Sequence, residues 1–166
     1  MSFPIRTVTR TVPVVLLGAL ALAGCAPAVA LEPGADAADP DCARVIVALP
    51  DTVAGLAARE TNAQGTGAWG DPASVILRCG VPSPDPTSSE CLLVDGIDWI
   101  RDDSKDPNFA FTTYGCTPAV EVIIDSDGDP DVDNDGVSGL EALTDLASAV
   151  GLVPQEGKCV SPADAG

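Results

Sequence analysis

The most pointed chemical pattern in this chain is an aspartate-rich run that precedes its last apolar segment. Calcium loops place oxygen ligands at alternate positions, then a glycine for a sharp turn, then a carboxylate that closes the shell. Gly136 stands at the glycine position here, after three aspartates at alternating positions. The candidate calcium ligands are Asp131, Asp133, Asp135, the carbonyl of Val137, and Glu141.

Two readings of this run stay open. It resembles the D-x-D-x-D-G repeats of bacterial calcium-binding surface proteins, although Ala142 stands at position twelve and the closing acid, Glu141, comes one residue early. The alternative is a solvated acidic linker, because seven acids and no base lie between Glu121 and Asp135. Calcium is therefore a candidate cofactor, and no other cofactor is expected.

Catalytic chemistry has few residues to use. The chain contains no histidine, which excludes Ser-His-Asp and Cys-His arrangements. It has no nucleophile elbow and no glycine-rich phosphate loop. Asp95 and Asp98, beside Trp99, remain a conceivable carboxylate pair for glycoside hydrolysis, but a turn explains Asp95 equally well. We expect the protein not to be an enzyme.

A ligand groove is a second possible site. Trp69 adjoins glycine and loop residues, Arg78 can pair with an acidic group, and Trp99 can stack on a sugar. The competing interpretation places both tryptophans in the core and Arg78 in a structural salt bridge.

The N-terminus indicates export. Arg6 and Arg10 precede an apolar run, Val12–Ala23, which is shorter than the roughly 20 residues that span a bilayer. Leu22-Ala23-Gly24-Cys25 resembles the lipobox of bacterial lipoprotein precursors. This resemblance implies cleavage of residues 1–24 as a signal peptide and acylation of Cys25 at the outer face of the cell membrane. A secreted protein or an uncleaved anchor is the alternative.

The mature chain is strongly acidic. Residues 25–166 carry 25 acidic and six basic side chains, a net charge of −19. Such a surface repels phosphate backbones, so nucleic acid is not an expected partner. Residues 25–41, rich in alanine, proline and aspartate, are predicted to form a lipidated flexible tether. Residues 42–166 are predicted to fold as one domain with an acidic loop at 125–136.

Five cysteines follow Cys25. Export favours disulfides, and no C-x-x-C metal spacing occurs. We prefer the pairs Cys79–Cys91 and Cys42–Cys159, although sequence leaves the connectivity open.

Apolar patterns predict a small α+β domain with a mostly antiparallel sheet. Strands are expected at 43–49, 74–79, 109–114 and 118–124, and a hairpin at 91–100 that turns at Asp95-Gly96. A short helix is expected over 51–57, and a C-terminal helix on the stripe from Leu140 to Val150.

Several short sequence motifs, in this order, resemble those of the actinobacterial domain-of-unknown-function family 3515. They are Ala68-Trp69-Gly70, Arg78-Cys79-Gly80-Val81, Cys91 with Val94-Asp95-Gly96-Ile97-Asp98-Trp99, and Thr113-Tyr114-Gly115 with Pro118-Ala119-Val120-Glu121-Val122. The resemblance implies an exported or membrane-attached envelope protein without an assigned activity, and it marks Cys116 as the spare thiol.

We therefore expect a non-catalytic envelope lipoprotein with an unknown protein or cell-wall partner. A calcium-dependent adhesion module and a carboxylate hydrolase are the alternatives.

Overall fold

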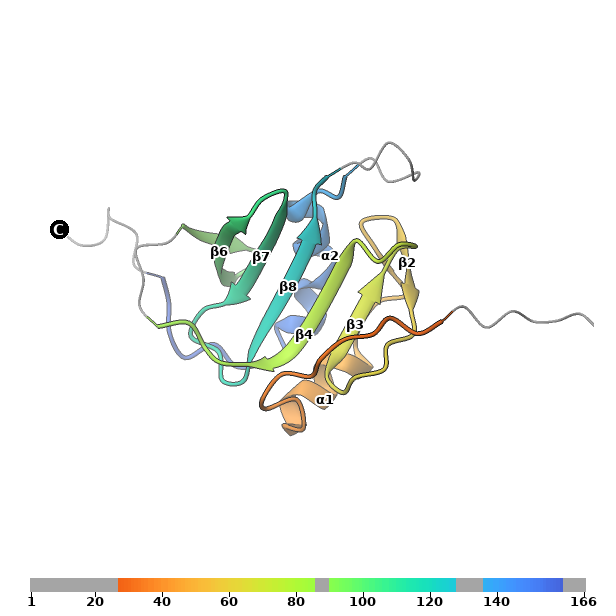
Figure 1. Cartoon of the computed structure of the whole chain (residues 1–166). Helices are drawn as coiled ribbons and strands as arrows, with labels where there is room; N and C mark the ends of the chain where they lie inside the picture. Colours follow the sequence, from red (N-terminus) through yellow and green to blue (C-terminus); the bar gives the residue numbers. More distant parts are fainter. Residues whose placement is uncertain (1–26, 86–89, 128–135, 160–166) are drawn as a thin grey trace, which may run out of the picture.

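The computed structural model describes residues 27–85, 90–127 and 136–159 (Figure 1). Within these residues one eight-stranded sheet is packed against two helices. The helices are α1 (Pro40–Val47) and α2 (Gly139–Val150). The strands are β1 (Thr52–Val53), β2 (Leu56–Arg59), β3 (Thr66–Trp69), β4 (Val75–Val81), β5 (Cys91–Val94), β6 (Ile97–Lys105), β7 (Asn108–Thr113) and β8 (Ala119–Asp125).

The strands lie in the order β1-β2-β3-β4-β8-β7-β6-β5, and every neighbouring pair is antiparallel. The first and last hairpins of the sheet, β1–β2 and β5–β6, therefore form its two opposite edges. This arrangement confirms the predicted α+β class with a mostly antiparallel sheet.

The core lies between the sheet and α2, which Figure 1 shows behind the central strands. Alternate residues of β4 and β8, such as Leu77 and Val122, point to this face and are fully buried. They meet Leu143 and Leu146 of α2. Strand side chains alternate between faces, so Arg78 and Glu121 point to the opposite face. We call that opposite side the outer face.

Several predicted elements are confirmed. The hairpin turns at Asp95 and Gly96, whose φ angles of 48° and 86° suit a type I′ turn. The strands expected at 74–79, 109–114 and 118–124 are β4, β7 and β8. The C-terminal helix is present as α2, although Leu140, expected on its apolar stripe, is exposed.

The elements before β3 differ from expectation. Residues 43–49, predicted as a strand from their β-branched content, belong largely to α1. The Asp39 side chain accepts a hydrogen bond from the Asp41 N–H, and Pro40 occupies the first turn, so capping outweighs strand propensity. Residues 51–57, predicted as a helix, form the β1–β2 hairpin around Ala54 and Gly55.

The segment predicted as a flexible tether is largely part of the fold. From Pro27 onward it runs across β3 and β4 (Figure 1). The Asp36 N–H donates to the Gly80 carbonyl at 2.9 Å. Glycine is required at both contact points, because a Cβ on Gly34 would lie 2.5 Å from the Gly80 carbonyl carbon, and one on Gly80 would lie 2.3 Å from the Ala37 nitrogen. We call residues 27–39 the N-terminal arm.

The preferred disulfide pairs were wrong, although the same four cysteines are bonded. The bonds join Cys42 to Cys79 and Cys91 to Cys159, with Cα–Cα distances of 5.5 and 6.4 Å. Cys79 faces the helices, so it meets Cys42 of α1, whereas Cys91 lies on the edge strand that the C-terminal segment reaches. Cys116 is free and buried, as expected of the spare thiol.

Candidate functional site

The expected groove of Trp69, Arg78 and Trp99 does not form. Trp69 and Trp99 are 1% and 0% exposed and belong to the core, so neither offers a ring face to a ligand. The Trp69 indole N–H donates to the Pro50 carbonyl at 3.0 Å. Both tryptophans follow the competing, structural interpretation.

Arg78 lies apart from the tryptophans, on the outer face. Its Nη1 donates to Oε2 of Glu121 at 3.1 Å, directly across the β4–β8 ladder. Its Nε donates to the Glu32 carbonyl at 3.2 Å, which fastens the N-terminal arm to the sheet. The arginine therefore connects three segments while about 30% of its side chain stays exposed.

A shallow concavity of about 150 Å³ begins at this ion pair and extends over β8, β7 and β6. We call it the outer trough. Its lining combines polar and apolar side chains: Arg78, Asp102, Ser104, Asn108, Phe109, Ala110, Glu121 and Ile123. A concavity of this size suits a side chain of a bound partner better than an enclosed small molecule, because small-molecule pockets are usually about 300 Å³ or larger.

A second concavity, of about 270 Å³, lies between the end of α1 and strands β2 and β3. Ile46, Leu49 and Pro50 form one wall, and Arg59 and Glu60 form the other. It is more open than the outer trough.

The carboxylate pair considered for hydrolysis is not brought together over a shared cavity. Asp95 occupies the exposed turn between β5 and β6. Asp98 is buried, and its Oδ2 accepts hydrogen bonds from the Cys159 N–H and the Gln155 amide at 3.4 and 3.3 Å. Neither residue lines the outer trough or the concavity beside β2. Asp98 therefore holds the C-terminal segment against β6.

Asp98 also lies beside two sulfurs. Donor atoms of Cys91, Asp98 and Cys159 fall within 4.8 Å of one another, as in a metal site. The two sulfurs are joined to each other, however, and a disulfide provides no thiolate ligand. In this oxidised form the cluster has a structural role, because it joins the C-terminal segment to β5 and β6.

Only some of the candidate calcium ligands lie among the residues that the structure describes. Asp131, Asp133 and Asp135 lie outside the described residues, as does Cys25. The Val137 side chain is buried, and its N–H donates to the Asp125 carbonyl at 3.1 Å. Glu141 is exposed in the first turn of α2.

Sequence reasoning missed the acidic and polar lining of the trough. A signal was present, because Arg78 and Glu121 each interrupt an otherwise apolar strand and so mark its solvent-facing side. Their direct opposition depends on strand register, which the sequence does not show. Asp102 and Asn108 carry no comparable signal.

The architecture defines a class: a disulfide-stabilised α+β domain with one antiparallel sheet, and terminal segments held against it by bonds to Gly80 and Asp98. The chain belongs to the family described as protein of unknown function DUF3515, whose model matches residues 8–157. No curated protein and no solved structure matches it. Among the described residues, neither helix has the length and apolarity to cross a membrane.

Proposed function

We propose that the protein is a lipoprotein of the cell envelope, anchored through Cys25 and acting as a non-catalytic binding or accessory module. The observation that carries this proposal is the pairing of four cysteines downstream of the lipobox into two disulfides. Such bonds persist in oxidising compartments and are rare in the cytosol. They therefore support the export that the N-terminal sequence predicts.

The anchoring half of the proposal is tested by substitution. Intact-mass analysis of protein extracted from membranes should show loss of residues 1–24 and a diacylglyceryl group on Cys25. Cys25→Ala should abolish the diacylglyceryl mass and leave residues 1–24 on the chain, because the signal at a lipobox is cut only after its cysteine is acylated. An unmodified Cys25 in membrane-extracted protein would contradict the proposal.

The outer trough is the best-supported binding surface. It is concave, mixes polar and apolar groups, and lies on the sheet face opposite α2. Asp102 lines it, whereas the neighbouring Asp103 does not. We therefore expect Asp102→Arg to abolish cross-linking to an envelope partner, and Asp103→Arg to retain it. Equal cross-linking by the two variants would exclude the trough as the binding surface.

Calcium binding is a second candidate, favoured by one hydrogen bond. The bond between the Val137 N–H and the Asp125 carbonyl brings the two ends of the acidic segment together. A closed loop reduces the conformational entropy that calcium would have to offset. Calcium should raise the melting temperature, and Asp131→Asn with Asp133→Asn should remove the rise. Asp102→Asn with Asp103→Asn is the matched control, and an equal loss in both would contradict a loop site.

A further inference from the structure

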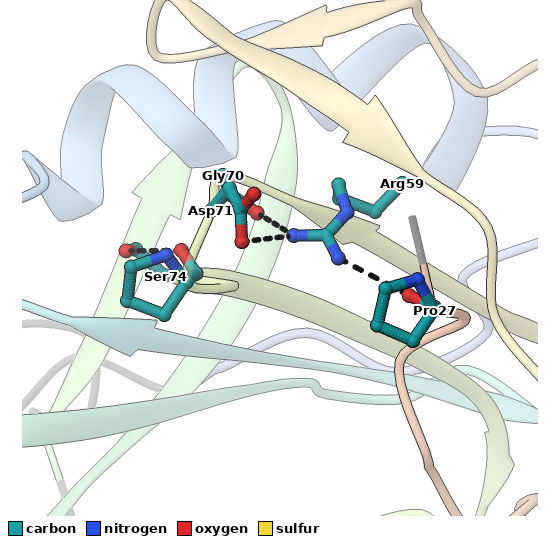
Figure 2. Close-up of polar contacts among 6 residues, drawn as sticks. Pro27, Arg59, Gly70, Asp71 and Ser74 are labelled. Carbon is teal, nitrogen blue, oxygen red and sulfur yellow. Dashed lines mark hydrogen bonds and ion pairs between the residues drawn. The ribbon is translucent and has the colours of Figure 1, made fainter. Parts of the chain in front are cut away.

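The first residue held in the fold, Pro27, is only two positions along the sequence from the proposed anchor, Cys25. Figure 2 shows the Pro27 carbonyl beside Arg59, whose Nη2 donates to it at 3.2 Å. Two residues later, the Val29 N–H donates to the Glu60 carbonyl at 2.8 Å, and Val29 accepts from the Asn62 N–H. The Leu31 N–H donates to the Asn62 side chain at 2.8 Å. The arm is therefore attached to the sheet from its first described residue.

Only Ala26 separates Pro27 from Cys25. Two extended residues reach at most about 7 Å, much less than the width of the domain. We propose that the sheet edge at which the chain enters, formed by β1, β2 and residues 27–31, lies directly on phospholipid headgroups. We call it the entry edge. This inference rests on the proposed anchoring at Cys25, because a freely secreted chain would impose no such contact.

The charge of the entry edge suits this contact. Residues 27–31, β1 and β2 carry one charged side chain, Arg59, and the acidic residues beside them include Asp51, Glu60, Asp71 and Asp145, whose Oδ2 accepts a hydrogen bond from the Ala54 N–H at 2.8 Å. Arg59 and Asp71 form an ion pair at 2.7 Å. The exposed side chains of β2, Ala57 and Ala58, are small and uncharged. The strands of the entry edge themselves therefore add no negative charge that would repel anionic headgroups, and its acids lie at the borders.

The opposite edge of the sheet is more acidic, because its strands themselves carry acidic side chains. Residues 90–108, which include β5 and β6, carry six acidic and two basic side chains. An orientation that presents this edge to anionic lipid would be repelled. The short chain connection and the charge asymmetry thus favour the same orientation.

The proposed orientation predicts how far the opposite edge of the sheet lies from the membrane. Neighbouring strands lie about 4.8 Å apart, so eight strands place β5 roughly 34 Å from β1. The β5–β6 turn would project away from the membrane, and the outer trough would stand roughly perpendicular to the bilayer, open to a partner in the envelope.

Fluorescence quenching in vesicles tests the proposal. Lipidated full-length protein in a Cys116→Ser background is labelled with bimane at Ala58→Cys on β2 or, separately, at Leu93→Cys on β5. Both positions are exposed and lie at opposite edges. Vesicles of phosphatidylcholine and phosphatidylglycerol contain a fraction of headgroup spin-labelled lipid. We expect at least threefold stronger quenching at residue 58 than at residue 93.

A Gly/Ser insertion of 20 residues between Ala26 and Pro27 is the matched control. Its root-mean-square length is about 25 Å, so quenching at residue 58 should fall to the level at residue 93. Ala57→Cys replaces Ala58→Cys if the latter does not fold. Equal quenching at the two edges, or quenching at residue 58 that the insertion leaves unchanged, would overturn the proposal.

The same samples distinguish the proposed anchoring at Cys25 from the proposed contact of the entry edge with lipid. Intact mass that lacks the diacylglyceryl group refutes anchoring and removes the basis for the contact. Intact mass that includes it, together with equal quenching at both edges, refutes the entry-edge contact and leaves the anchoring intact.

Discussion

Two buried tryptophans differ in one hydrogen bond. The Trp69 indole N–H reaches the Pro50 carbonyl, whereas the Trp99 indole N–H is buried and finds no acceptor among the described residues. Phenylalanine at either site leaves a comparable cavity. Trp69→Phe also breaks a hydrogen bond, but Trp99→Phe removes an unpaired donor.

We therefore expect Trp69→Phe to lower the free energy of unfolding by roughly 1–3 kcal/mol more than Trp99→Phe does. Urea unfolding monitored by far-UV circular dichroism measures both. An equal or larger loss for Trp99→Phe would contradict the assignment.

The free thiol is shielded by its surroundings. Burial raises the pKa of Cys116 above its ordinary 9.0, a hydrogen bond with Thr113 acts in the opposite direction, and the Asp98 carboxylate raises the pKa further. At neutral pH the thiol is neutral and inaccessible, which makes it unreactive. The folded state favours the protonated form, so stability falls as the pH rises through 9.0 and above.

We expect Cys116 to resist iodoacetamide at pH 8 in the native protein and to react fully in urea. Peptide mass mapping identifies the alkylated residue. Reaction at comparable rates with and without urea would show that the thiol is accessible in the folded state.

Among the elements, the N-terminal arm depends on close glycine contacts. A Cβ on Gly34 would collide with the backbone of Gly80 rather than with a flexible side chain, so the arm must shift. Gly34→Ala should cost roughly 1–3 kcal/mol and expose residues 27–39 to protease. Ala30→Ser, on an exposed position of the same arm, is the control. Unchanged proteolysis and melting temperature in Gly34→Ala would contradict the tight contact.

Sequence patterns correctly predicted the strands that bury one side of the sheet and expose the other. The alternation in β4 and β8 and the Asp95-Gly96 turn identify their structures directly. The arm was missed because its stability comes from backbone contacts with Gly80 and Asn62, and its alanine- and proline-rich composition is the same as that of a linker.

The predictions for residues 43–49 and for the disulfide pairing were wrong for related reasons. The capping signal at Asp39-Pro40 competes with β-branched residues, and tertiary contact decides between them. The partner of Cys42 depends on which face of β4 each side chain occupies. The outer trough combines residues from four strands, so strand order must be known before its residues can be grouped.

At the scale of the whole molecule, the net charge of −17 opposes compaction. Raising NaCl from about 20 mM to about 500 mM should increase the melting temperature by several degrees, because screening weakens the repulsion. Calcium chloride at equal ionic strength distinguishes screening from ion binding. A melting temperature that does not respond to NaCl would show that the acids are too far apart to matter.

The Cys42–Cys79 bond has a mechanical consequence. A pull applied at residue 25, the proposed anchor, first detaches the arm from Glu60 and Asn62 and then from β4, and about 17 residues extend by at most roughly 60 Å before the bond becomes taut. Beyond that point the load enters a central strand through a covalent link. Tension on the proposed anchor is thus taken up by a fixed length of extended chain while the sheet stays folded.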